Sequence, residues 1–125
     1  MTQKLYRRRI AEAHGRRSES LAALLLTCKF YRVIGRRVKT RAGELDLIAK
    51  TPLGILCFVE VKARRLEDEA AEAVTHRQRA RIAKAAELYL GARPGLRHNG
   101  VRFDAIFVVP RRLPRHVKDA WRPDS

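Results

Sequence analysis

The chain has 125 residues, enough to close one domain around a single core and too few for two. Its hydrophobic fraction of 46% argues against disorder, and no apolar run approaches the ~18 residues that a membrane span needs. Lysine and arginine number 28 against 13 acids, a formal net charge of +15, which favours a nucleic-acid partner over a soluble domain that is merely arginine-rich.

The first predicted element is a helix from about Ile10 to Cys28, where apolar residues recur near helical spacing. Residues 1–9 are expected to form a flexible basic segment before it. Glu19 lies in the middle of this helix. On spacing alone, Glu19 is interpreted as a solvent-facing residue that pairs with Arg16 or Arg17.

Three strands are predicted next, at Phe30–Val38, Glu44–Lys50 and Ile55–Lys62. The second and third are joined by Thr51-Pro-Leu-Gly54, whose proline and glycine are typical of a tight turn. The third strand is apolar on both faces for most of its length. It is therefore expected to be a central strand that is covered on both sides.

The second half of the chain contributes a helix and a strand. Thr75 is a predicted N-cap for a helix over His76–Leu90. Val101–Val109 is the fourth predicted strand, and Trp121 in the short tail is expected to anchor the last turn to the core. The order of elements predicts an α/β domain that has a central mixed sheet flanked by helices.

Acidic residues occupy positions in these strands where apolar residues are expected. Asp46 lies near the middle of the second strand, and Glu60 and Lys62 share one face of the third because side chains alternate along a strand. If the hairpin pairs in register, the two carboxylates approach each other, and they repel unless a cation lies between them. Mg2+ takes one or two carboxylates together with water and phosphate oxygens. A lysine beside such a cation favours phosphodiester hydrolysis.

Structural ion pairs are the alternative interpretation of the same acids. Glu60 could pair with Lys62 or with Arg41, and Asp46 with an arginine of the first helix. A Glu-x-Lys pair on its own is a weak motif. Asp104 is a further acid in an apolar strand, and a pair with Arg102 or Arg41 is at least as well supported for it as a catalytic role.

Two cysteines, Cys28 and Cys57, lie in apolar runs with no partner at metal-ligand spacing. They are predicted to be small buried hydrophobic residues in a reducing compartment. No signal-type cleavage site follows the basic N-terminus. A cytoplasmic protein with no membrane partner is expected.

The hairpin carries a recognisable pattern. From about Gly15 to Trp121, this pattern consists of Glu19, Gly43-Glu44-Leu45-Asp46-Leu47-Ile48-Ala49, Phe58-Val59-Glu60-Val61-Lys62-Ala63-Arg64, Val74, Arg102-Phe103-Asp104 and His116…Asp119-Ala120-Trp121. In these residues the chain resembles the UPF0102 (YraN-like) family of small bacterial proteins, whose members look like Holliday-junction resolvases and restriction-endonuclease-like nucleases. Where family members often carry a lysine in the second helix, this chain has Gln78.

The resemblance implies a restriction-endonuclease-like domain and a set of roles. Asp46, Glu60 and Lys62 would take the nuclease motif positions, with Asp46 and Glu60 binding Mg2+ or Mn2+ and with Glu19 as the acid carried by the helix. Glu44 would support these residues from behind, and Gln78 would orient water or phosphate. Candidates for phosphate contact, chosen by clustering, are Arg16, Arg17, Arg36, Arg37, Arg64, Arg65, Arg77 and Arg81.

The first functional hypothesis is therefore a metal-dependent endonuclease that acts on structured or branched DNA. A homodimer is expected because a resolvase cuts two strands symmetrically. The second hypothesis is a nucleic-acid-binding protein that retains the nuclease fold without cutting. The third is a basic protein that assembles on ribosomal RNA.

Overall fold

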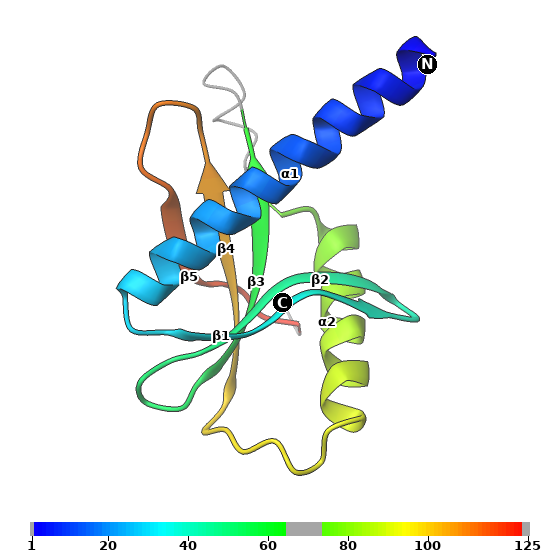
Figure 1. The fold of residues 1–125 in the computed structure, drawn as a ribbon. Coiled ribbons are helices and arrows are strands. Elements are labelled where there is room, and N and C mark those ends of the chain that lie inside the picture. The colour runs from blue at the N-terminus through cyan, green and yellow to red at the C-terminus, as the bar shows by residue number, and fades with distance from the viewer. Residues whose placement is uncertain (1, 65–73, 124–125) are drawn as a thin grey trace.

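A five-stranded sheet separates two helices in the computed structural model, which describes residues 2–64 and 74–123 (Figure 1). The strands lie in the order β1-β2-β3-β4-β5. In chain order the elements are α1 (Gln3–Cys28), β1 (Arg32–Thr40), β2 (Gly43–Lys50), β3 (Leu56–Ala63), α2 (His76–Gly91), β4 (Val101–Val108) and β5 (Arg115–Trp121). The predicted α/β class with a mixed sheet and flanking helices is confirmed, and the arrangement is consistent with a nuclease-like fold.

The sheet is mixed because one of its connections passes through a helix. β1, β2 and β3 pair antiparallel, β3 and β4 pair parallel across the α2 crossover, and β4 and β5 pair antiparallel. The predicted turn between β2 and β3 is confirmed. The backbone N–H of Ile55 donates to the hydroxyl of Thr51 (3.0 Å), and Gly54 adopts a φ of 87° that a residue with a Cβ rarely takes.

Two cores lie on opposite faces of the sheet. Phe58 packs with Ile82 and Tyr89 of α2, whereas Cys57 and Val59 pack with α1. Alternate residues of β3 therefore enter different cores, as strand geometry requires. β3 is buried along most of its length, which confirms the prediction of a central strand covered on both sides.

The first helix is longer than its apolar pattern indicates. α1 begins at Gln3 and not near Ile10, so residues 3–9, expected to be a flexible basic segment, are helical. The side chain of Thr2 accepts a hydrogen bond from the backbone N–H of Leu5 (3.2 Å) and so caps the helix. Apolar spacing could not predict this extension, because the side chains of residues 2–9 are exposed.

The second helix begins where the sequence predicts. The Thr75 hydroxyl accepts from the backbone N–H of Gln78 (3.2 Å), and the Gln78 side chain accepts from the backbone N–H of Thr75 (3.1 Å). This reciprocal pair is a capping box. The segment of residues 65–73 before it lies outside the described residues.

A fifth strand, β5, forms in the tail, where the sequence predicts only a final turn. Trp121 at its end is buried and stacks on Phe103 with ring centroids 5.4 Å apart, so the predicted anchor is confirmed. β5 also buries His116, whose side chain is 1% exposed. Of the two cysteines, Cys57 is buried as predicted, but Cys28 is exposed on the last turn of α1, which corrects the prediction for it.

Asp104 is fully buried in β4 within a network of hydrogen-bond donors. Arg102 donates two bonds to its carboxylate (both 2.8 Å), His116 Nε2 lies 2.8 Å from Oδ2, and the backbone N–H of Asp119 donates to Oδ1 (3.0 Å). The predicted pair with Arg102 is confirmed. Burial alone would raise the pKa of Asp104, but the donors of His116 and Arg102 lower it to about 2.

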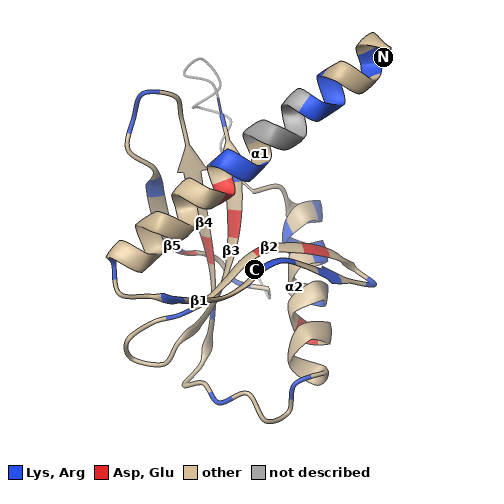
Figure 2. Cartoon of the chain, in the orientation of Figure 1, with Lys and Arg blue, Asp and Glu red and all other residues tan. Residues whose placement is uncertain are grey.

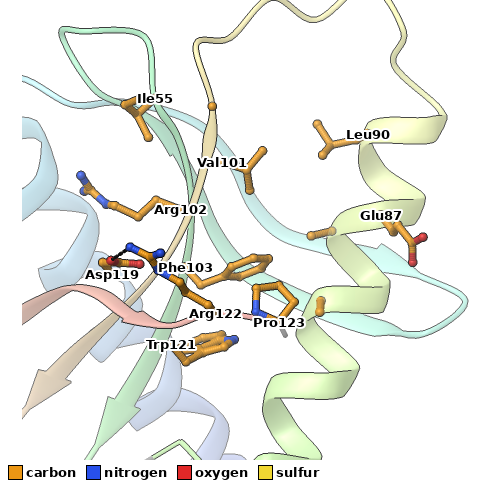
Figure 3. Close-up of a pocket in the computed structure, with 13 residues that line it drawn as sticks. Ile55, Glu87, Leu90, Val101, Arg102, Phe103, Asp119, Trp121, Arg122 and Pro123 are labelled. Carbon is orange, nitrogen blue, oxygen red and sulfur yellow. Dashed lines mark hydrogen bonds and ion pairs between the residues drawn. The ribbon is translucent and has the colours of Figure 1, made fainter. Parts of the chain in front are cut away.

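A pocket of about 850 Å³ lies between α2 and the ends of β4 and β5 (Figure 3). Its walls are mainly apolar and include Leu90, Phe103 and Trp121, and Arg122 reaches Asp119 at its rim (3.1 Å). None of the lining residues is one of the hairpin acids. In the part of the chain that the structure describes, neither helix has an apolar stretch that could cross a membrane.

Candidate active site

Three carboxylates from two elements converge beside the sheet. Glu19 comes from α1, and Glu44 and Asp46 come from β2. One oxygen of each carboxylate lies within 4.8 Å of an oxygen of the other two. Glu19 is buried, and the other two are half-buried. We call these three residues the acidic cluster.

The end of the β2–β3 ladder explains how Asp46 reaches this cluster. The last paired residues of this ladder are Leu47 and Val59, so Asp46 and Glu60 are the next residues in register. There the ladder ends, and Asp46 Oδ2 accepts the backbone N–H of Val61 (2.9 Å) in place of a strand partner. The side chain of Asp46 is thereby held at the opening between the two strands.

Glu60 and Lys62 of β3 lie beside this opening. Both are buried, and Lys62 Nζ is 3.8 Å from Glu60 Oε1. Burial raises the pKa of Glu60 to about 7, with a further contribution from the charge of Asp46 and a side-chain hydrogen bond to it. Burial also lowers the pKa of the Lys62 ammonium group. The two strands therefore bring together the two acids and the lysine that the sequence singles out.

Asp46 is destabilised as an anion in this setting. Its pKa is raised by burial and by the charges of Glu19 and Glu44, while the N–H of Val61 and the charge of Lys62 act in the opposite direction. A divalent cation would relieve this repulsion. The donor set consists of carboxylate oxygens, which are the ligands that Mg2+ and Mn2+ prefer, so the residues present fit such an ion.

Glu19 corrects the interpretation based on spacing alone. It is buried and ion-paired with Arg37 of β1, whereas spacing indicated a solvent-facing residue paired with Arg16 or Arg17. Arg37 lies 18 positions further along the chain, so no local pattern could identify it as the partner.

The predicted phosphate contacts occupy different positions relative to the cluster. Lysine and arginine occur along α1, β1 and α2 (Figure 2). Arg16, Arg17, Arg36, Arg77 and Arg81 are exposed, and Arg37 and Arg64 are half-buried. The charges of Arg81 and Arg64 act on Lys62, and Arg81 also acts on Glu60, so both arginines lie beside the site. Arg65 lies outside the described residues.

Gln78 caps the start of α2. Its side-chain oxygen accepts the backbone N–H of Thr75 in the capping box, so this oxygen is engaged within the start of α2. Glu44, expected to support the site from behind, is instead a member of the acidic cluster. The sequence could have indicated this, because Glu44 and Asp46 are two residues apart on one strand and share a face.

Metal-free protein is expected to lose stability as the pH rises, because folding raises the pKa of Glu60 from 4.5 to about 7. The stability that protonated Glu60 contributes is fully present below about pH 4.5 and is lost as the pH rises through about 7. Urea denaturation in EDTA should show a loss on the order of 3 kcal/mol between about pH 5 and about pH 8. Glu60→Gln should remove most of this loss.

The exposed Glu87 provides the matched control, because Glu87→Gln makes the same chemical change on the surface of α2. This variant should keep the pH dependence of the wild-type protein. An unaltered pH dependence in Glu60→Gln would show that Glu60 does not titrate in this range.

Comparisons with a family model and with individual proteins both identify the same family. The sequence model of the family described as "Uncharacterised protein family UPF0102" matches residues 18–108. A UPF0102 protein of Parvibaculum lavamentivorans is 51% identical over 109 residues, covering 87% of this chain and 81% of the relative. One from Paramagnetospirillum magneticum is 46% identical over 118 residues, covering 91% of each chain. One from a Caulobacter species is 46% identical over 119 residues, covering 95% of this chain and 85% of the relative.

Proposed function

The chain belongs to the uncharacterised protein family UPF0102, and we propose that it is a metal-dependent endonuclease that hydrolyses phosphodiester bonds in structured or branched DNA. The observation that carries this proposal is the convergence of Glu19, Glu44 and Asp46 within 4.8 Å. Such a cluster in a chain of net charge +15 suits a cation and a phosphate better than it suits a structural core.

Asp46 and Glu60 would hold Mg2+ or Mn2+, and Glu19 and Glu44 would complete the oxygen donors or orient water. When bound, such an ion polarises a phosphoryl oxygen and acidifies water. Asp46 is half-buried, and the N–H of Val61 fixes its carboxylate beside the other acids, which suits this role.

Lys62 would act on the phosphate itself. Its ammonium group is buried beside Glu60, where the low dielectric strengthens its interaction with charge that develops on a phosphoryl oxygen. Its lowered pKa also brings it closer to exchanging a proton with water at neutral pH. Lys62 therefore has the position and the chemistry to assist the attack of water.

The exposed arginines would hold the DNA backbone. Arg16 and Arg17 on α1 precede Glu19 by less than one helical turn, and Arg81 of α2 acts on Glu60 from the other helix. Phosphate contacts from both helices would place the backbone across the acids. A homodimer, which would cut two strands symmetrically, remains part of this proposal, as does a cytoplasmic location.

The proposal predicts cleavage that requires both a divalent metal and Lys62. Labelled four-way junction, flap, single-stranded and linear duplex DNA should be incubated with the protein in Mg2+, in Mn2+ and in EDTA. We expect cleavage of at least one structured DNA in metal and none in EDTA. Lys62→Met, which keeps the apolar stem but removes the charge, should cleave at least about 100-fold more slowly.

The control for this experiment is Lys84→Met on the exposed face of α2, which should cleave at the wild-type rate. Binding of DNA that persists in EDTA, with no cleavage of any substrate in either metal, would contradict the proposal. That result would favour a nucleic-acid-binding protein that retains the nuclease fold.

A further inference from the structure

Arg37 has an unusual backbone conformation inside a paired strand. Its φ is 50°, in the left-handed region that a residue with a long side chain seldom adopts. Arg36 pairs with Leu47 and Val38 pairs with Leu45, so Arg37 stands opposite Asp46 in the β1–β2 ladder. Unusual conformations of this kind persist only where the surrounding structure holds them, and they concentrate at functional sites.

The side chain of Arg37 is directed at the acidic cluster. Its Nε donates to Glu19 Oε2, and its charge interacts with Glu44 and Asp46 as well. The hydrogen bond to Glu19 raises the pKa of Arg37, which therefore stays charged. The Arg37 side chain is 37% exposed and that of Glu19 is 11% exposed, so the guanidinium lies on the solvent side of the acid.

Arg37 therefore supplies a positive charge beside the acidic cluster. Three carboxylates within 4.8 Å of one another repel, and Arg37 offsets part of that charge. A divalent ion that binds the same carboxylates competes with the guanidinium for Glu19. By linkage, each cation must weaken the binding of the other by the same factor.

We propose that Arg37 is the resident counter-cation of the acidic cluster, that Mg2+ or Mn2+ displaces it from Glu19, and that the released guanidinium then binds a phosphate of the DNA. This inference rests on the proposed function and adds to it a residue that binds the substrate. Because the side chain of Arg37 lies on the solvent side of Glu19, release moves it toward solvent, from which the substrate arrives. The exchange couples metal binding to DNA binding.

Arg37→Gly removes the side chain without straining the backbone, because glycine adopts positive φ readily. Arg37→Asn is a second variant whose residue also tolerates this conformation. Lys39→Ala is the matched control, since Lys39 is an exposed cation of the same strand and stands opposite Glu44 in the β1–β2 register.

Mn2+ affinity should be measured by calorimetry at fixed ionic strength. We expect Arg37→Gly to bind Mn2+ about tenfold more tightly than wild type, and Lys39→Ala to change the affinity far less.

Binding of junction DNA supplies a second readout that a purely structural role would not produce. In EDTA, Arg37 is engaged by Glu19, so Arg37→Gly should lose DNA affinity only through the change in net charge, by no more than Lys39→Ala does. With Ca2+ as the divalent ion, Arg37→Gly should bind junction DNA about tenfold more weakly than wild type does. The slope of its DNA affinity against salt concentration should fall by about one phosphate contact.

Equal Mn2+ affinities for Arg37→Gly, Arg37→Asn and wild type, with metal-dependent cleavage intact, would overturn this inference and leave the proposed function standing. A gain in Mn2+ affinity that Lys39→Ala reproduces would also overturn it, because general charge would then explain the effect. Absence of Mn2+ binding by the wild-type protein would overturn both proposals together.

Discussion

Asp46→Asn is expected to lower metal-dependent cleavage by at least about 100-fold while leaving the fold intact. The amide oxygen of asparagine can still accept the N–H of Val61, as Asp46 Oδ2 does at 2.9 Å. The substitution removes a negative charge from the centre of the acidic cluster, so it weakens the hold on a divalent ion without removing volume. The measurement is the single-turnover rate on the best DNA substrate, together with Mn2+ affinity.

DNA binding separates this effect from a loss of substrate. With one acid fewer beside the phosphate, Asp46→Asn should bind DNA at least as tightly as wild type in EDTA. Asp119→Asn makes the same change at an exposed site in β5, and it should cleave normally. Cleavage by Asp46→Asn at the rate of this control would remove Asp46 from the site.

Asp104→Asn is expected to destabilise the protein by about 3 kcal/mol, because it leaves the donors around a buried carboxylate without their anion. The side chain of Asp104 is fully buried and receives bonds from Arg102, His116 and the backbone of Asp119. An amide would place its own N–H against one of these donors. Urea denaturation near neutral pH measures the loss.

The pH dependence of stability gives an independent check on Asp104. Folding lowers its pKa from 3.8 to about 2, so its contribution is present above about pH 3.8 and is lost as the pH falls toward 2. Wild type should lose roughly 2 kcal/mol over this range through Asp104 alone, and Asp104→Asn should lack that component. Asp119→Asn, which also suits the positive φ of 52° at that position, should match wild type in both tests.

Short-range signals in the sequence predict most of the fold. The turn at Thr51-Pro-Leu-Gly54 and the N-cap at Thr75 lie where the residue types require them. β5 is missed because its residues are mostly polar and its partner is β4, so its apolar pattern is weak. Cys28 is misplaced because it lies in an apolar run but on the outer face of the last turn of α1.

The site is predictable to the extent that its residues are close in sequence. Asp46, Glu60 and Lys62 follow from strand alternation and a hairpin in register, and the structure brings the three together. Their roles as metal ligands and catalytic groups remain predictions. Glu19 is placed by the family resemblance, since spacing alone gives the opposite interpretation.

The contacts that sequence reasoning misses are those that join distant segments. Arg37 contacts Glu19 from a backbone conformation in the left-handed region within β1, and no sequence pattern predicts that conformation for an arginine. The network around Asp104 also includes two residues that are distant in sequence. The Tyr31 hydroxyl accepts a hydrogen bond from Arg102 (2.8 Å), and Lys29 Nζ lies 2.9 Å from His116 Nδ1. Tyr31 lies 71 positions before Arg102, and Lys29 lies 87 positions before His116.

The central claim, that the acidic cluster and Glu60 hold a divalent cation, is tested most directly by anomalous diffraction from crystals grown in Mn2+. The account predicts an anomalous peak about 2.2 Å from a carboxylate oxygen of Asp46, with Glu60 or Glu19 as a further ligand. An anomalous peak that lies only elsewhere on the protein would contradict this claim. So would a structure at saturating Mn2+ in which Arg37 still contacts Glu19 and no peak lies beside Asp46.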